Sequence, residues 1–413
     1  MLKLDFDTGS ADFWVFSTLI RPRDILELTA KKHTVFNPHK SRTWKWPERE
    51  WGGFLDPFSF HRPRLPWKTK YGDGTEAEGV TGYDTVRLGE VEIKSQAIQL
   101  ATSYQGPQFL HGTADGVLGL AFGHLNSVEH PGPVKTPLET MIERRLIQER
   151  LFTVNLNCGF ESFFTFGYVD EESRAGQDIH WVDVDRRGGF WNFNSGYARV
   201  GDKKLIRRGG QAIADTGSNL ILTHPHISYM IYSRIKGAIF NRKQPGWIYP
   251  KDSPVPEVSF SIGNDDRFMI TINELNLAHL EVGKGYYFGA IQDNPAYESG
   301  GPQFDVFGTP FFRQVYAIFD VEKDRFGVVK KTHEPGVART LVKQKFTDFM
   351  GQEVENSPDG SILEESTYKR QKTMLSEGSR SSGGSALLEE DIYGTPMIYD
   401  EPQDMDKGKE RAE

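Results

Sequence analysis

The feature that most constrains this chain is a tetrapeptide, Asp-Thr-Gly-Ser, that occurs twice. The first copy covers residues 7–10 and the second residues 215–218, so the copies lie about half a chain apart. Apolar residues precede and follow both, which predicts a strand, a tight turn that carries the Asp, and a second strand. One such tetrapeptide is weak evidence, because these residues are common in turns. Two copies with matching flanks predict two equivalent loops that each present one carboxylate.

The residues that follow each Asp have physical roles in such a turn. Gly9 and Gly217 let the backbone turn sharply and close up beside the carboxylate. Thr8 and Thr216 supply hydroxyls that can tie the two turns together. Two facing carboxylates resist simultaneous ionisation, so one keeps a proton and acts as an acid while the other acts as a base. Such a pair can activate water against an amide carbonyl and protonate the leaving nitrogen without a metal or a covalent nucleophile.

Four further stretches make the chain resemble the pepsin-like aspartic endopeptidases, especially the fungal secreted members similar to aspergillopepsin and penicillopepsin. Residues 70–75 (KYGDGT) resemble the flap, a hairpin that closes over substrate. Residues 115–122 (DGVLGLAF) and 304–312 (FDVFGTPFF) resemble the strands that support the first and second Asp loops. Residues 316–328 resemble the end of the domain, so the resemblance covers roughly residues 2–331.

The resemblance implies a mostly β, bilobal pepsin-like acid protease fold with a substrate cleft between two β-rich lobes. We expect a first lobe over residues 1–183, with the first Asp loop and the flap, and a second over 184–331, with the second Asp loop. Residues 332–413 are acidic and poor in core residues, so they are expected to be disordered and dispensable for the fold. The aspartic-protease dyad is itself the standard example of paired carboxylates, so this chemistry is taken over from the family.

Carried over residue by residue, the resemblance assigns the catalytic pair to Asp7 and Asp215. The positions that support the catalytic loops are Thr8, Gly9, Ser10, Thr216, Gly217 and Ser218, of which the two serines are expected to orient the carboxylates. The flap and substrate-binding positions are Tyr71, Gly72, Asp73, Trp14, Phe109 and Val117. Trp14 is expected to anchor Tyr71, while Asp73 either contacts substrate or only shapes the turn.

The implied activity is hydrolysis of peptide bonds with an acidic pH optimum, on protein or peptide substrates, by a monomer that is secreted or vacuolar. The alternative is a catalytically dead, truncated or peptide-binding relative, because the chain starts at the first Asp loop and the family's N-terminal strand is missing. Such a chain is expected to expose an unpaired strand edge and to be poorly soluble or inactive. No apolar region of signal-peptide length follows Met1.

Other functional classes, such as nucleic-acid-binding, membrane or metal-dependent proteins, find little support in the sequence. The net charge of −8 lies mostly in the tail, so the body gives no charge argument for a nucleic-acid or membrane partner. Residues 40–69 interleave Trp with basic residues, a pattern that a nucleic-acid surface could show. The preferred interpretation is an inserted surface loop, or non-coding sequence translated through a faulty gene model. The lone Cys158 excludes an internal disulfide. His224 and His226 lack further ligands nearby, so neither a metal nor a cofactor is expected.

Two local expectations concern helices. Residues 137–151 show the clearest helical spacing of apolar residues, with charges on the other face. Residues 18–39 are predicted as loop, with Pro22 and Pro38 as breakers.

Overall fold

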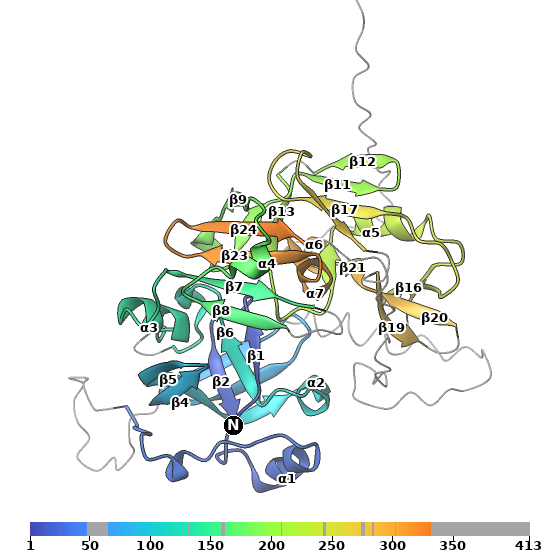
Figure 1. Cartoon of the computed structure of the whole chain (residues 1–413). Coiled ribbons are helices and arrows are strands. Elements are labelled where there is room, and N and C mark those ends of the chain that lie inside the picture. Colours follow the sequence, from blue (N-terminus) through green and yellow to red (C-terminus); the bar gives the residue numbers. More distant parts are fainter. Residues whose placement is uncertain are drawn as a thin grey trace, which may run out of the picture. The chain divides into compact units, whose positions relative to one another are not determined.

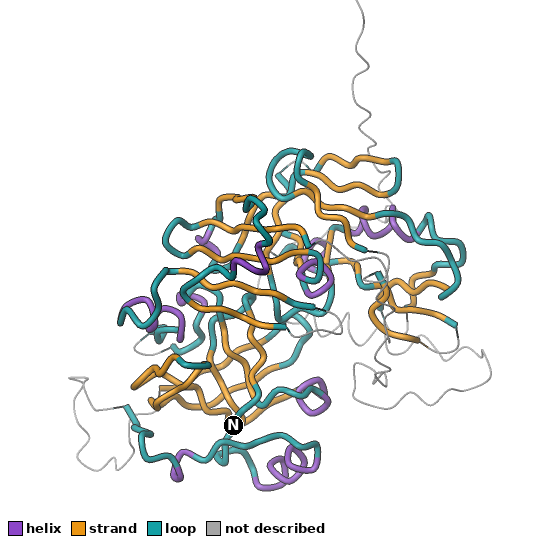
Figure 2. Tube along the Cα trace, viewed as in Figure 1, coloured by secondary structure: helices purple, strands orange, loops and turns teal. Residues whose placement is uncertain are grey.

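The computed structural model describes residues 1–47, 65–129, 132–157, 162–207, 209–242, 245–273, 277–282, 285–301 and 303–331. Within these residues the chain is mostly β, with five sheets and short helices between their strands (Figures 1 and 2). The mostly β class predicted from the sequence is therefore confirmed. Cys158, the predicted tail 332–413 and residues 48–64 of the stretch 40–69 lie outside the described residues.

The first sheet carries the first Asp loop. Its strand order is β1 (Leu4–Asp7), β6 (Gly116–Gly119), β2 (Phe13–Phe16), β5 (Val91–Gln105), β4 (Glu76–Leu88) and β3 (Leu65–Lys70). β6 pairs in parallel with β1 and antiparallel with β2, and β2 pairs in parallel with β5. The chain therefore passes from one side of β6 to the other through the turn that contains the first Asp-Thr-Gly-Ser.

A second sheet repeats this plan around the second Asp loop. Its strand order is β10 (Asn192–Asn194), β13 (Gln211–Ala214), β22 (Asp305–Phe307), β14 (Ile221–Thr223) and β21 (Ile291–Asp293). Here β22 pairs in parallel with β13 and antiparallel with β14, and β14 pairs in parallel with β21. The two sequence copies thus occupy equivalent turns in two sheets of the same local topology.

A third sheet joins early and late parts of the chain. Its strand order is β8 (Phe163–Phe166), β7 (Leu151–Asn155), β23 (Val315–Asp320), β24 (Arg325–Lys330) and β9 (His180–Asp183). The β7–β23 pair is antiparallel, with Phe319 opposite Phe152, and their rings stack with centroids 4.4 Å apart. Residues that resemble the end of the domain therefore pair with strands that precede residue 183.

Two four-stranded sheets complete the second half of the described chain. One has the order β12 (Lys203–Ile206), β11 (Tyr197–Val200), β17 (Val258–Ser261) and β18 (Met269–Ile272). The other has the order β15 (Ile239–Asn241), β16 (Gly246–Pro250), β20 (Tyr286–Gly289) and β19 (Ala278–Val282). All strand pairs in both sheets are antiparallel.

The helices are short, and two sequence predictions about them were wrong. The α-helices are α1 (Pro22–Ala30), α2 (Pro107–His111), α3 (Pro137–Glu143), α4 (Glu171–Arg174), α5 (Pro225–Tyr232), α6 (Ala296–Ser299) and α7 (Thr309–Phe312), and the 3₁₀ turns are η1 (Pro38–Lys40), η2 (Gly123–Leu125) and η3 (Arg186–Gly188). Residues 18–39 contain α1, because Pro22 stands at the first turn of a helix, where its missing N–H costs nothing. Helix α3 ends at Glu143, because Arg145 adopts a positive φ of 55° and closes the helix before β7.

Candidate active site

The two Asp loops are joined by reciprocal hydrogen bonds between their threonines. The backbone N–H of Thr8 donates to Thr216 Oγ1 (3.0 Å), and the N–H of Thr216 donates to Thr8 Oγ1 (2.9 Å). Each hydroxyl then donates to the strand that leads into the opposite loop, Thr8 to the carbonyl of Ala214 (2.8 Å) and Thr216 to that of Phe6 (2.5 Å). Both threonines are buried, so these four bonds hold the ends of β1 and β13 together.

The glycines of the two loops let the carboxylates approach. A Cβ atom built on Gly9 would lie 2.5 Å from Cγ of Asp215, and one on Gly217 would lie 2.6 Å from Cγ of Asp7. Real Cβ atoms do not tolerate such contacts, so each carboxylate occupies the space left by the glycine of the other loop. The structure therefore brings Asp7 and Asp215 to one place from sequence positions about half a chain apart.

The carboxylates differ in their hydrogen bonds. Asp7 accepts the N–H of Gly9 at Oδ1 (2.7 Å) and the hydroxyl of Ser10 at Oδ2 (2.5 Å). Asp215 accepts the N–H of Gly217 at Oδ1 (2.9 Å). The expectation that both serines orient a carboxylate fails for the second loop, because the hydroxyl of Ser218 donates to the carbonyl of Leu220 instead (3.0 Å).

This asymmetry appears in the electrostatics of Asp215. Burial raises the pKa of its carboxyl well above the ordinary value of 3.8, and the negative charge of Asp7 and a hydrogen bond between the two side chains raise it further. Proximity of like charges is expected to make one member of a carboxyl pair hold its proton. In this pair the raised pKa belongs to Asp215, and Asp7 accepts one hydrogen bond more than Asp215 does, from the hydroxyl of Ser10.

The joining of the loops by their threonines yields a testable stability effect. Thr8→Val keeps the side-chain shape but leaves the N–H of Thr216 and the carbonyl of Ala214 without their partner. Each buried polar group so orphaned costs about 1–3 kcal/mol. We expect the free energy of urea unfolding to fall by a few kcal/mol, and Thr8→Ser to restore most of the loss. Thr102→Val, which removes a hydroxyl bonded at an exposed strand, should have little effect, and an equal loss there would contradict the assignment.

Tyr71 is hydrogen-bonded to Trp14. Tyr71 follows β3, and its hydroxyl accepts a hydrogen bond from Nε1 of Trp14 (2.7 Å). Its ring meets the edge of Phe109 (6.1 Å between centroids), which also packs edge-to-face on Trp14 (5.3 Å). Burial, followed by the negative charge of Asp7, raises the pKa of Tyr71 well above its ordinary value of 10.0. The hydroxyl therefore stays protonated, and the charge of Asp7 acts on it.

Other predicted site residues have more local contacts. Asp73 accepts the N–H (2.9 Å) and the hydroxyl (2.7 Å) of Thr75 at Oδ1, so that oxygen shapes the turn between β3 and β4. Nothing lies within 4 Å of a Cβ built on Gly72, so its backbone is open to a ligand. Val117 is buried on β6 opposite Trp14 and belongs to the apolar cluster that contains Phe109.

Two acidic residues near the site were missed by sequence reasoning. Asp5 lies two residues before Asp7 on β1, and partial desolvation and the charge of Asp7 raise its pKa to about 6. Asp12 is buried and accepts hydrogen bonds from Gln99 (2.8 Å) and the N–H of Ser127 (2.8 Å). The alternation of residues in LDFD places Asp5 and Asp7 on one face of the strand, and that signal could have identified the first of them.

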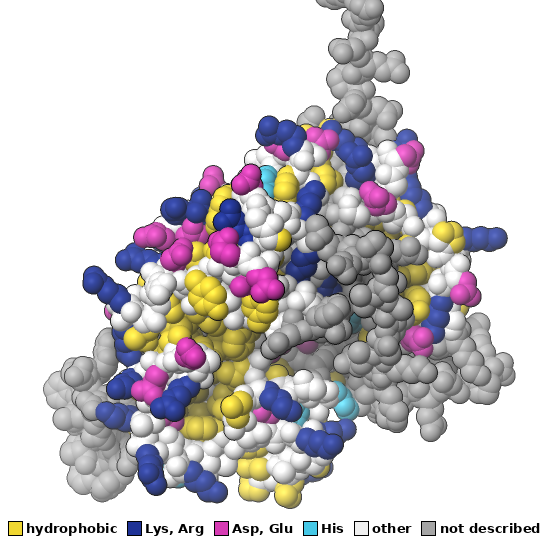
Figure 3. Space-filling model, viewed as in Figure 1, with side chains coloured by type: hydrophobic (Ala, Val, Ile, Leu, Met, Phe, Trp, Pro, Cys, Tyr) yellow, Lys and Arg dark blue, Asp and Glu magenta, His cyan; other side chains and the backbone are white. Residues whose placement is uncertain are grey.

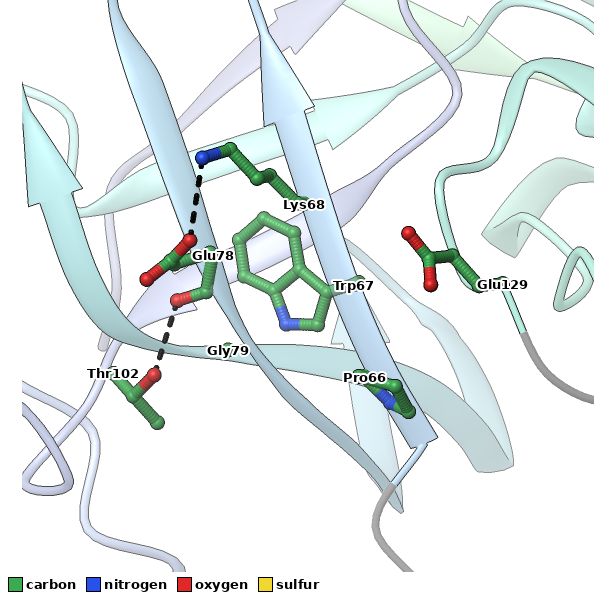
Figure 4. A pocket seen from close by; sticks show the side chains of 7 residues that line it. All are labelled: Pro66, Trp67, Lys68, Glu78, Gly79, Thr102 and Glu129. Atoms are coloured by element: carbon green, nitrogen blue, oxygen red, sulfur yellow. Dashed lines mark hydrogen bonds and ion pairs between the residues drawn. The ribbon is translucent and has the colours of Figure 1, made fainter.

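A pocket of about 250 Å³ lies on the first sheet, beside β3, β4 and β5 (Figure 4). It is lined by Pro66, Trp67, Lys68, Glu78, Gly79, Thr102 and Glu129. Figure 4 shows Lys68 reaching across to Glu78 (3.5 Å), with the Trp67 indole close by. Neither member of the carboxyl pair lines it, so this pocket is separate from the candidate site.

No metal site was found among the described residues: no group of three His, Cys, Asp or Glu side chains there could hold a metal ion. No helix in that part of the chain is long and apolar enough to span a membrane.

Comparison with known proteins agrees with this geometry. The family model for eukaryotic aspartyl proteases matches residues 1–54 and 56–331. Aspergillopepsin-1 of Aspergillus oryzae is 33% identical over 328 residues, covering 79% of this chain and 75% of its own. Penicillopepsin-1 of Penicillium rubens is 32% identical over 326 residues, covering 79% and 74%. The chain therefore belongs to the eukaryotic aspartyl protease family, and its class of activity is that of an aspartic endopeptidase.

Proposed function

We propose that Asp7 and Asp215 together hydrolyse peptide bonds by general acid–base catalysis. The observation that carries this proposal is the mutual approach of the two carboxylates, each in the space left by the glycine of the opposite loop. The ionised Asp7 acts as the base that takes a proton from the attacking water. The protonated Asp215 donates its proton to the substrate carbonyl oxygen, which gives a tetrahedral gem-diol. As the C–N bond breaks, Asp7 passes the proton that it took from water to the leaving nitrogen, and Asp215 recovers its proton from a gem-diol hydroxyl, so the starting state of the pair returns. The pair shares protons, so it titrates as a unit.

Supporting roles follow from the contacts around the pair. Ser10 and the N–H of Gly9 keep the carboxylate of Asp7 in one orientation. Tyr71 is held by Trp14, and the residue after it, Gly72, has open space beside its backbone. We propose that this turn closes over an extended peptide, which the backbone of the flap binds by hydrogen bonds while alternate side chains enter pockets. Phe109 and Val117 supply apolar surface beside the tyrosine.

The activity should have an acidic optimum. Asp215 keeps its proton while the pH is below the raised pKa of its carboxyl, and it loses the proton as the pH rises through that value. The same sign applies to stability: because the folded pKa is above the ordinary 3.8, the stabilisation is complete below 3.8 and disappears as the pH rises through the folded pKa. We expect kcat/KM for a peptide to fall on its alkaline limb as the pH rises through the raised pKa of Asp215.

The measurement is a pH–rate profile of the purified full chain, together with inhibition by a statine-type peptide. The inhibitor's hydroxyl would occupy the place of the attacking water between the two carboxylates. A pH–rate profile that peaks above neutrality would contradict the proposed acid–base pair. Loss of activity on addition of a chelator, with no inhibition by the statine-type peptide, would also contradict it. A secreted or vacuolar compartment and a monomeric enzyme are proposed with this function, and the compartment accords with an acidic working range.

A further inference from the structure

A row of exposed cations follows helix α1. Residues 28–47 contain Lys31, Lys32, Lys40, Arg42 and Lys45 but neither Asp nor Glu. All five side chains are exposed, and none forms an ion pair with another described residue. We call these five residues the cationic strip. In Figure 3, Lys and Arg side chains recur along the lower edge of the molecule, where Figure 1 places α1 and the segment after it.

Exposed cations in other described regions are arranged differently. Many are paired with a neighbouring carboxylate, as in Lys68–Glu76, Arg87–Glu92, Lys135–Glu143, Arg187–Asp185 and Arg267–Asp265. A row of like charges without such partners repels itself and weakens the fold slightly. A solvated surface usually mixes both signs. The strip is thus an unusual surface for this chain, and an anionic partner would relieve its repulsion.

The strip is mounted on a well-anchored backbone. The N–H of Phe36 donates to the carbonyl of Phe16 (2.8 Å), and the ring of Phe36 packs on Trp44 (5.7 Å between centroids). Trp44 fills the space in front of Gly82, and the backbone of Lys45 exchanges two hydrogen bonds with Tyr83 (2.7 and 2.8 Å). The backbone between the cations is therefore anchored, and its ordering adds little to the entropic cost of binding.

We propose that the cationic strip binds a linear polysaccharide that carries sulfate esters. The aromatic rings of this segment are half-buried against one another, so they form no stacking platform for the bases of a single-stranded nucleic acid. Recognition therefore rests on the positive charge of this one segment, which a linear polyanion matches. Sulfate esters keep their charge in acid, whereas carboxylates lose theirs. This choice of anion rests on the acidic working range proposed above.

The test is calorimetric titration of the full chain with a heparin-derived oligosaccharide at acidic pH. The strip variant carries Lys31→Gln, Lys32→Gln, Lys40→Gln and Arg42→Gln. The matched control loses the same charge at four exposed, ion-paired positions, through Lys94→Gln, Lys135→Gln, Arg187→Gln and Arg267→Gln. We expect affinity to fall about tenfold or more in the strip variant, with a shallower dependence on salt, because fewer counterions are released. The control should remain close to wild type.

The outcomes separate this proposal from its rivals. If both variants lost affinity for the oligosaccharide equally, binding would depend on net charge alone, and the cationic strip would not be the binding site. Tighter binding of duplex DNA than of the oligosaccharide would overturn the class of partner, and equal binding of a carboxylated polysaccharide in acid would overturn the choice of sulfate. Binding is measured without turnover, so Asp7→Asn should bind the oligosaccharide as wild type does even if the proposed catalysis is wrong.

Discussion

Replacing either Asp7 or Asp215 with Asn lowers kcat for peptide hydrolysis by about 10²–10⁴-fold, the range that one positioned acid or base contributes. An amide in place of Asp7 cannot take a proton from water. An amide in place of Asp215 cannot hold the proton that burial and the charge of Asp7 maintain there. Each variant loses one half of the pair, so neither should keep more than a trace of activity on denatured haemoglobin at acidic pH.

The control for this experiment is Asp202→Asn, which changes an exposed aspartate in the turn between β11 and β12. It should leave kcat unchanged. Circular dichroism of all three variants would show whether the fold is intact. Activity close to wild type in a folded Asp7→Asn or Asp215→Asn protein would remove the basis of the proposed mechanism.

Adding a single methyl group to a catalytic loop should be nearly as damaging. In Gly9→Ala the new Cβ meets the carboxylate of Asp215, and in Gly217→Ala it meets that of Asp7. One loop must then move away from the other, and a displacement of about 1 Å at a reacting group costs on the order of 100-fold in rate. We expect a loss of kcat of that size in either variant.

Gly188→Ala is the matched control for the loop glycines, because its nearest non-neighbouring atom, in Phe190, lies 3.8 Å from the added Cβ. It should retain full activity. Both loop variants should also show a changed pH profile, since the distance between the two carboxylates sets the pKa of Asp215. An active Gly9→Ala enzyme with an unchanged profile would mean that the close approach of the loops does not matter for the chemistry.

The parts of this structure that sequence could predict are those with a strong local pattern. The two Asp-Thr-Gly-Ser copies predicted equivalent turns, and the paired sheets around β6 and β22 have that equivalence. Tyr71 and Trp14 were paired by resemblance and are hydrogen-bonded in the structure. Such motifs fix their own geometry, because a short turn leaves few arrangements for the residues that it contains.

The features that the sequence did not predict are those for which one residue has more than one possible conformation or hydrogen-bond partner. Ser218 occurs in the same tetrapeptide as Ser10, yet its hydroxyl donates to the backbone carbonyl of Leu220 instead of a carboxylate. Pro22 was interpreted as a breaker, although proline begins helices as readily as it ends them. Helix α3 is shorter than its apolar spacing suggests, because the backbone at Arg145 reverses before β7.

The sheet that pairs β7 with β23 has a consequence for biosynthesis. β7 is complete at Asn155, but its partner on one side begins at Val315, about 160 residues later. At the roughly 5–20 residues per second of translation, one edge of β7 waits on the order of ten seconds for that partner. During this interval the nascent chain presents an apolar strand with unpaired N–H and C=O groups, which favours misassociation between neighbouring nascent chains. Slow translation should therefore lower the yield of native enzyme, and a chaperone that shields this edge should restore it.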